Sequence, residues 1–209
     1  MKKIIVFVAI FLMSSCATKK FKEKWTTLKA PDTFKARFET TQGNFDIEAK
    51  REWSPNGVDR LYQLIKNKYY QDVAIFRVVP NFVAQFGIHT DTLINNAWQN
   101  RGIKDEPVIA KNDKMTIAFA RGGVNTRSNQ IFINLKDNYR LDKLAYSGVT
   151  GFPVVAKVIE GEENVLKFYN GYGESLGRKQ GEISQKGNAF LKKEYPKVDY
   201  VIKAYILKK

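Results

Sequence analysis

The stretch FRVVPNFVAQFG, residues 76–87, places one cation, Arg77, in an otherwise apolar run that also holds Phe82 and Gln85. A guanidinium held among apolar side chains is a set of fixed hydrogen-bond donors, which can stabilise charge that develops as a substrate reacts. Taken singly, an arginine on a strand is more often a solvated residue of the outer face. The run is therefore a candidate active-site segment, and whether Arg77 is functional or merely solvated depends on the other segments of the chain.

Two further segments contain residue types that could do chemistry. His89 is the only histidine, and no second histidine or cysteine exists to complete a transition-metal site with it, so we assign it no metal and no reaction. The stretch RGGVNTRS, 121–128, has paired glycines, but no P-loop lysine follows them. It is better interpreted as a turn whose glycines adopt positive φ.

The segments around these candidates are mostly short and alternating. Residues 34–50 predict a β-hairpin, and residues 54–70 predict an amphipathic helix with Ser54 as N-cap and Pro55 at its first position. Further strands are predicted at 73–80, 82–87, 114–120, 129–135, 152–161 and 198–209, with a second short helix from 162 and polar loops at 88–106 and 171–189. Eight strands without parallel βαβ spacing predict a mainly β fold, a closed eight-stranded antiparallel barrel capped by two α-helices.

The N-terminus, MKKIIVFVAIFLMSSCATKK, has the layout of a bacterial secretory signal. Its apolar run from Ile4 to Met13 is too short to span a bilayer as a mature helix. Cys16, the only cysteine, follows in LMSSC, which resembles a lipobox. We expect residues 1–15 to be a lipoprotein signal peptide and Cys16 to be the lipid-attachment residue. The alternative is an incidental cysteine in a signal peptide.

Length and composition favour one domain. A chain of 209 residues that is 44% hydrophobic can bury one sizeable core. The polar, lysine-rich residues 16–33 predict a tether from the lipid to a domain at 34–209. After processing, no cysteine would remain for a disulfide, so stability would come from the core alone.

The formal charge of +14 does not predict nucleic-acid binding here. The lysines are scattered, and the aromatic residues alternate with aliphatic ones as in strands, without forming a stacking platform. We expect a solvated basic surface that lies against anionic lipid headgroups.

Four segments, in this order, resemble the signature segments of the cyclophilins, the barrel-shaped peptidyl-prolyl cis/trans isomerases. They are FRVVPNFVAQFG, MTIAFARGGVNTRSNQIFINL, the Leu-Asp pair at 141–142, and FPVVAKVIEGEENV. The resemblance runs from about residue 34 to the C-terminus and is densest between 76 and 161. It implies a cyclophilin-like fold, proline-containing polypeptides as clients, no cofactor, and a monomer.

The resemblance also assigns roles to individual residues. The family's catalytic positions fall on Arg77, Phe82 and Gln85. Its substrate-binding positions fall on Val83, Ala120, Arg121, Gly122, Gln130, Phe132, Leu141 and Phe152.

Five positions depart from the commonest family pattern. Val83 replaces a methionine, Arg121 an asparagine and Arg140 a tryptophan, while Phe76 and Phe152 stand where histidines are usual. These changes bear on inhibitor binding and sequence preference more than on catalysis.

The implied chemistry is rotation about an X-Pro amide, which is slow because rotation breaks amide resonance. A catalyst needs only to bind the twisted amide more tightly than either planar form. In the twisted state the prolyl nitrogen regains a lone pair, to which the Arg77 guanidinium can donate a hydrogen bond. The phenylalanines would hold the proline ring, and Gln85 would orient the guanidinium or the substrate carbonyl.

Three functions compete at this point. The first is an isomerase that assists folding of exported or envelope proteins, and the second is a module that binds proline peptides or scaffolds a partner, with incidental turnover. Retention of Arg77, Phe82 and Gln85 favours the first, since a pure binder needs the pocket more than the arginine. A ligand-carrying barrel of the lipocalin type would give the arginine no role. Ala17 after the cysteine favours a lipid anchor in the outer membrane that faces the periplasm.

Overall fold

A computed structural model describes residues 20–208 of the chain. Its strands are β1 (Thr33–Thr40), β2 (Gly43–Lys50), β3 (Val73–Ala74), β4 (Arg77–Val79), β5 (Val83–Phe86), β6 (Thr116–Phe119), β7 (Ile131–Asn134), β8 (Ala145–Tyr146), β9 (Val149–Thr150), β10 (Val154–Glu160) and β11 (Tyr200–Ile206). The α-helices are α1 (Pro55–Lys66), α2 (Thr92–Gln99), α3 (Arg140–Lys143), α4 (Glu162–Val165), α5 (Gly173–Gly177) and α6 (Gln180–Glu194). Two 3-10 helices, η1 (Glu23–Thr27) and η2 (Arg51–Trp53), complete the described elements.

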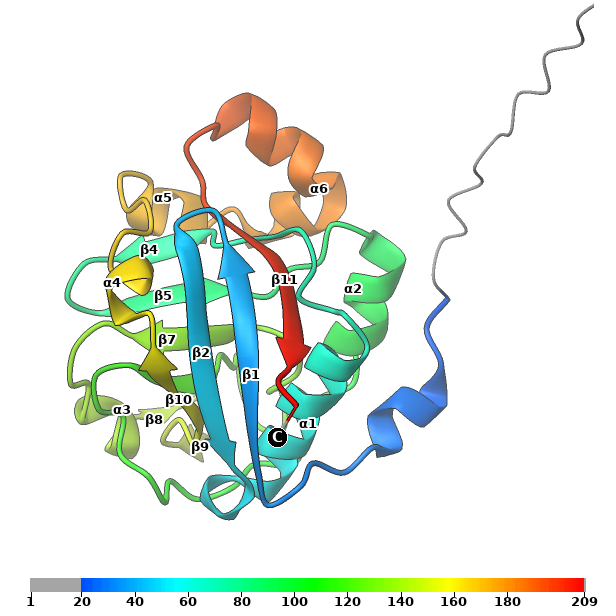
Figure 1. Cartoon of the computed structure of the whole chain (residues 1–209), viewed down its shortest axis with the longest axis vertical. Coiled ribbons are helices and arrows are strands. Elements are labelled where there is room, and N and C mark those ends of the chain that lie inside the picture. The colour runs from blue at the N-terminus through cyan, green and yellow to red at the C-terminus, as the bar shows by residue number, and fades with distance from the viewer. Residues whose placement is uncertain (1–19, 209) are drawn as a thin grey trace, which may run out of the picture.

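Nine strands form one antiparallel sheet in the order β3-β11-β1-β2-β10-β6-β7-β5-β4, and β8 and β9 form a separate hairpin. Figure 1 shows the large sheet curled, so that β1 and β2 run across β5 and β7. The predicted mainly β, antiparallel fold is confirmed. The predicted closed eight-stranded barrel is wrong, because the sheet has nine strands and no ladder within residues 20–208 joins its edge strands, β3 and β4. The sheet is a half-barrel.

The two edge strands come from one predicted strand. The sequence predicts a single strand over 73–80, but the structure interrupts it at Ile75 and Phe76. Ile75 is buried in the main core, whereas Phe76 is buried in a second apolar cluster under α5 and α6. Because these neighbours enter different clusters, the chain leaves one edge of the sheet and begins the other. The two edge strands, β3 and β4, are therefore connected by the backbone at Ile75 and Phe76 and not by hydrogen bonds of a ladder.

The core lies inside the curl of the sheet. Phe38 and Phe45 stack at 5.0 Å on paired positions of β1 and β2, and they share one buried cluster with Ile133 of β7. Helix α1 adds its apolar positions to this cluster, as its spacing predicts: Val58, Leu61, Leu64 and Ile65. Burial of such side chains from both halves of the sheet holds the curl together.

Helix α1 begins as predicted, with Pro55 at its first position, but its cap differs. The Ser54 side chain makes no capping hydrogen bond to the helix. Instead, the Glu106 carboxylate accepts from the backbone N–H groups of Asn56, at 2.7 Å, and Gly57, at 3.2 Å. A carboxylate is favourable at this end of a helix because the unpaired N–H groups carry partial positive charge.

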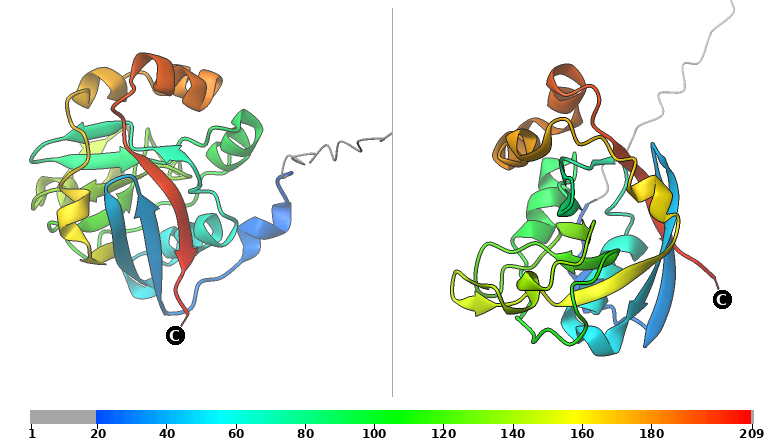
Figure 2. Two further views of the ribbon diagram at one scale, coloured as in Figure 1. Left: turned by 45° about the horizontal axis from the view of Figure 1, so that its top comes forward. Right: turned by 90° about the vertical axis from the view of Figure 1, so that its left-hand side faces the viewer.

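Two segments predicted as polar loops contain helices. Within 88–106 lies α2, whose N-cap Asp91 accepts from the N–H groups of Leu93 and Ile94. Within 171–189 lie α5 and most of α6, whose apolar residues pack on Phe76. Figures 1 and 2 show α5 and α6 together at one end of the molecule, with α5 next to β4.

Part of the predicted tether lies against the domain. Trp25 of η1 is buried in the main core, and the Phe21 ring packs edge-on against Trp98 of α2 at 5.3 Å. The predicted signal peptide, residues 1–15, and the predicted lipid-attachment residue Cys16 lie outside the described residues. Between residues 20 and 208, no helix has the length and apolar character needed to cross a membrane.

Candidate active site

A tight hairpin places the three predicted catalytic residues. Strands β4 and β5 pair so that Arg77 lies directly opposite Gln85, and Asn81 makes the turn with φ of 55°, a conformation that asparagine tolerates better than most residues. Phe82 follows the turn and its carbonyl accepts from the Leu135 N–H at 2.9 Å. The hairpin thus brings cation, ring and amide to one face.

Hydrogen bonds fix the polar pair. The Arg77 Nη1 donates to the Gln85 Oε1 at 3.0 Å, and the Gln85 Nε2 donates to the Gln130 Oε1 at 2.9 Å. Gln85 is 6% exposed, so its amide is largely shielded from competing water. The Arg77 guanidinium also lies 5.5 Å from the Phe82 ring centroid. Arginine, glutamine and phenylalanine therefore act as one preorganised unit.

An apolar slot adjoins this unit because the strands continue in register. Gln85 pairs with Phe132 on β7, which in turn pairs with Ala118 on β6. Phe132 is 5% exposed and meets the Phe152 ring edge-on at 5.7 Å. These side chains belong to one small apolar cluster, which consists of Val83, Ala118, Phe132 and Leu141 with Phe82, Ala120, Leu144 and Phe152 packed against it.

The cluster lines a surface groove of about 380 Å³. Nine of the eleven residues predicted for the site line this groove: Arg77, Phe82, Val83, Gln85, Ala120, Arg121, Phe132, Leu141 and Phe152. The other two, Gly122 and Gln130, line an adjacent hollow of about 460 Å³ that shares Gln85, Ala120 and Arg121 with the groove. The predicted residues thus gather in one continuous region.

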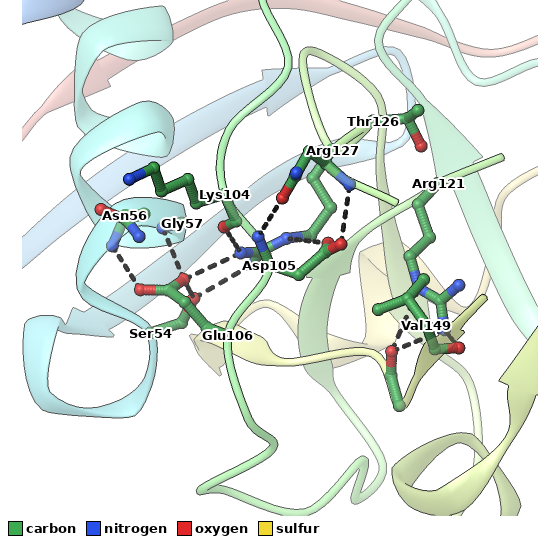
Figure 3. Close-up of polar contacts among 12 residues, drawn as sticks. Ser54, Asn56, Gly57, Lys104, Asp105, Glu106, Arg121, Thr126, Arg127 and Val149 are labelled. Carbon is green, nitrogen blue, oxygen red and sulfur yellow. Dashed lines mark hydrogen bonds and ion pairs between the residues drawn. The ribbon is translucent and has the colours of Figure 1, made fainter. Parts of the chain in front are cut away.

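Arg121 supports one wall of the groove. Its guanidinium donates to the backbone carbonyls of Tyr146, Val149 and Gly151 at 2.9 to 3.1 Å, and it lies 4.4 Å from the Phe152 ring centroid. Burial lowers the pKa of this guanidinium. Figure 3 shows the Arg121 side chain reaching Val149. The arginine that replaces the expected asparagine therefore holds the β8–β9 hairpin beside the predicted substrate-binding positions.

A buried ionic cluster anchors the turn that follows Arg121. Arg127 is fully buried, and its Nη2 donates to the Glu106 Oε2 at 2.9 Å and to the Lys104 carbonyl at 2.6 Å. Ser54 also donates to Glu106, and Figure 3 shows these groups together at the start of α1. The cluster ties the 121–128 turn to α1. The expectation of positive φ at the turn's glycines is wrong, since it is Asn125 that has φ of 58°.

Sequence reasoning missed several groove residues. Leu144 follows α3 and Tyr146 lies in β8, and Gln180 comes from α6, which begins in the segment predicted to be a surface loop. Arg140, known from the sequence only as a replacement for tryptophan, lines the groove with its guanidinium 5.0 Å from the Phe82 ring centroid. No local pattern marks Gln180, because only the fold brings the start of α6 to the groove.

The replacement of histidine at Phe76 has a structural reason. Phe76 is 1% exposed and packs in one cluster with Leu176 and Ile183 of the α5–α6 segment. An apolar ring at this position gives that segment a surface to pack on, which a histidine would provide only with an unpaired polar nitrogen.

A curled antiparallel sheet with an arginine and a glutamine beside an apolar slot is the arrangement that the resemblance to cyclophilins implies. The family model described as cyclophilin type peptidyl-prolyl cis-trans isomerase/CLD matches residues 35–186. The chain therefore belongs to the cyclophilin family, and by class it is a peptidyl-prolyl cis-trans isomerase.

Individual relatives agree with this assignment. A peptidyl-prolyl cis-trans isomerase of Acinetobacter baylyi is 32% identical over 133 residues, which cover 63% of this chain and 69% of that protein. A peptidyl-prolyl cis-trans isomerase-like 2 of Neurospora crassa is 30% identical over 133 residues, but the match spans only 21% of its length. A crystal structure of a cyclophilin type isomerase from Cryptosporidium parvum has the same fold, with a TM-score of 0.58 at 17% identity over 85% of this chain and 99% of that one.

Proposed function

We propose that this chain catalyses cis/trans isomerisation of X-Pro bonds in exported or envelope proteins, from a lipid anchor on Cys16. The observation that supports the activity is the Arg77 guanidinium, which is held by Gln85 at 3.0 Å beside the slot of Phe132 and Leu141. The lipid anchor and the envelope location rest on the sequence of the N-terminus. The protein would act as a monomer without a cofactor.

The reaction proceeds without bond cleavage. The proline ring enters the apolar slot, and the substrate backbone lies along residues 120–122. As the amide twists, the prolyl nitrogen becomes pyramidal and accepts a hydrogen bond from Arg77. The planar amide offers that nitrogen lone pair only weakly, so the bond stabilises the transition state more than either ground state. Part of the barrier of about 18–20 kcal/mol is thereby removed.

Exchange spectroscopy tests the activity. An Ala-Pro peptide is a suitable probe, because the Cryptosporidium parvum cyclophilin was also solved in the presence of the dipeptide ala-pro. Catalytic amounts of the protein should broaden the separate cis and trans NMR signals of the peptide into an exchanging pair. A peptide that binds, by chemical-shift titration, without faster exchange would instead favour the scaffold module.

A further inference from the structure

The helical segment that follows β10 reaches the catalytic arginine. Helix α5 lies beside β4 (Figure 1), and Gly177 is so close to Arg77 that a Cβ at that position would stand 2.9 Å from the Arg77 Cδ and 3.0 Å from its Cγ. The stem of the arginine is therefore packed directly on α5. A side chain at Gly177 would push the arginine out of place.

A carboxylate of the same helix accepts two hydrogen bonds from the guanidinium of Arg77. The Glu174 Oε2 accepts from the Arg77 Nε at 3.0 Å, and the Glu174 Oε1 accepts from Nη2 at 2.6 Å. This is the two-bond fork geometry that makes arginine–carboxylate pairs strong and directional. The hydrogen bond from Arg77 holds the pKa of the Glu174 carboxyl below its usual range, so the carboxylate is ionised at neutral pH.

Glu174 leaves the groove free. Arg77 lines the groove, whereas Glu174 lines neither the groove nor the adjacent hollow. The carboxylate takes the Nε and Nη2 edge, and Gln85 takes Nη1, so these bonds use three of the five N–H groups of the guanidinium. One hydrogen on Nη1 and one on Nη2 remain for a ligand in the groove.

We propose that Glu174 is a positioning residue for isomerisation, which holds the Arg77 guanidinium so that one of its two remaining N–H groups can donate to the twisted prolyl nitrogen. The inference rests on the proposed activity and adds to it a residue from outside the family's signature segments. A free arginine samples many rotamers, and a donor that must be oriented during the reaction is a poorer catalyst than one oriented beforehand.

The carboxylate also opposes the arginine's charge, but orientation outweighs this effect. The Glu174 side chain is 48% exposed, against 20% for Arg77, so water screens its charge at a distance. The two hydrogen bonds act at contact distance, 2.6 and 3.0 Å, and their direction fixes the orientation of the guanidinium. Removal of Glu174 should therefore slow isomerisation and should not accelerate it.

The experiment compares Glu174→Ala and Glu174→Gln with the wild-type full chain in Ala-Pro peptide exchange and in peptide titration. Glu174→Ala should lower the exchange rate about tenfold, within the roughly 10²-fold that a misplacement of about 1 Å can cost, with unchanged peptide affinity. Glu174→Gln should lie between, because one amide oxygen still accepts. The matched control is Glu182→Ala, which removes a glutamate of α6 that is paired with Lys179 and Lys186, and it should behave as wild type.

A double-mutant cycle separates positioning from a general effect on the fold. In an Arg77→Ala background, Glu174→Ala should cause no further loss of rate, since the residue acts only through Arg77. A further loss of rate there, an unchanged rate in the single variant, or a faster one would each overturn the inference.

One readout does not depend on activity. The ¹⁵N order parameter of the Arg77 Nε–H group should be high in the wild type and should fall in Glu174→Ala, but not in Glu182→Ala. A mobile Arg77 in the wild type would show that Glu174 does not hold it. A wild-type chain with a rigid Arg77 but no exchange activity would overturn the proposed activity and, with it, the role of Glu174 in isomerisation. It would still show that Glu174 holds Arg77 in place.

Discussion

Gln85 lies directly opposite Arg77 in the β4–β5 ladder, and its amide oxygen accepts a hydrogen bond from the Arg77 Nη1 at 3.0 Å. Because the guanidinium can only donate, the amide oxygen must face Arg77, and the amide nitrogen donates to Gln130. Arg77 therefore has a buried partner on its own sheet and an exposed partner, Glu174, on a separate helix. Its geometry depends on both.

Arg77→Ala should cripple isomerisation and leave the fold intact. Loss of one positioned donor typically costs about 10²–10³ in rate, and Arg77→Lys should recover little because an ammonium lacks the planar fork. Stability should change by about 1 kcal/mol or less, since the ion pair with Glu174 is partly exposed. Peptide exchange rates and melting curves check both expectations. A parallel loss of rate and melting temperature would make the arginine a structural residue.

Arg140 should make binding of cyclosporin-type inhibitors weak. In the family, the tryptophan that it replaces packs on the drug and donates an indole hydrogen bond. Here the exposed Arg140 guanidinium lies over the Phe82 ring instead. Arg140→Trp should tighten binding about tenfold or more, the value of one regained hydrogen bond with its packing. Calorimetric titration measures this, and nanomolar binding by the wild type would contradict it.

Glu106→Ala should destabilise the protein strongly. It would leave the fully buried Arg127 charge without its nearest carboxylate, and α1 without its cap. Removing one partner of a buried pair typically costs about 3–5 kcal/mol. Chemical denaturation measures the loss. The control is Glu162→Ala, whose exposed pair with Lys114 should contribute about 1 kcal/mol or less. Equal effects of the two variants would show that the Arg127 cluster is not a special source of stability.

His89 should make folding stability fall in mildly acidic solution. Burial lowers its pKa in the folded protein from 6.5, against smaller opposing effects of Asp91 and Asp72, and its Nδ1 accepts the Asp91 N–H at 2.9 Å. Between the unfolded and the folded pKa, only the unfolded chain binds the proton, so stability decreases as pH falls below about 6.5. The slope should not exceed about 1.4 kcal/mol per pH unit. Denaturation of His89→Gln should be flat from pH 7 to about pH 5, where carboxylates begin to titrate.

Cys16→Ser should abolish lipid attachment and leave an unprocessed precursor, because Ser15-Cys16 is the only lipobox-like bond in the chain. Metabolic labelling with a fatty-acid probe, followed by membrane fractionation, measures this. A variant that matures normally and remains with the membrane would refute the anchor.

The sheet was largely predictable, because the alternation of the strands and the hairpin around Thr41–Asn44 are local signals. The helices α2 and α6 were not predicted. The cap of α2 at Asp91 was visible in the sequence, but the polar composition of 88–106 outweighed it. In α6 the glycines favoured a loop, and the structure accommodates Gly187 as a kink with φ of 58°.

The groove was predictable where its residues lie in the signature segments, since the register of the strands places Arg77, Gln85 and Phe132 in one row. The contacts of Glu174 and Gln180 were not, because they depend on where a segment about a hundred residues away packs. That segment packs on a buried cluster that includes Phe76. In the sequence, Phe76 is visible only as a replacement for a histidine.

The placement of β1 between β2 and β11 sets an order for biosynthesis. The partner of β1 on one side is Tyr200–Ile206, which lies far along the chain, so β1 keeps an unpaired edge until residues 200–206 have been made. Contacts of such long sequence separation slow folding. A nascent chain would therefore keep this side of the sheet open until residues 200–206 are available, and a chain truncated before residue 200 would present β1 as a free edge to other chains.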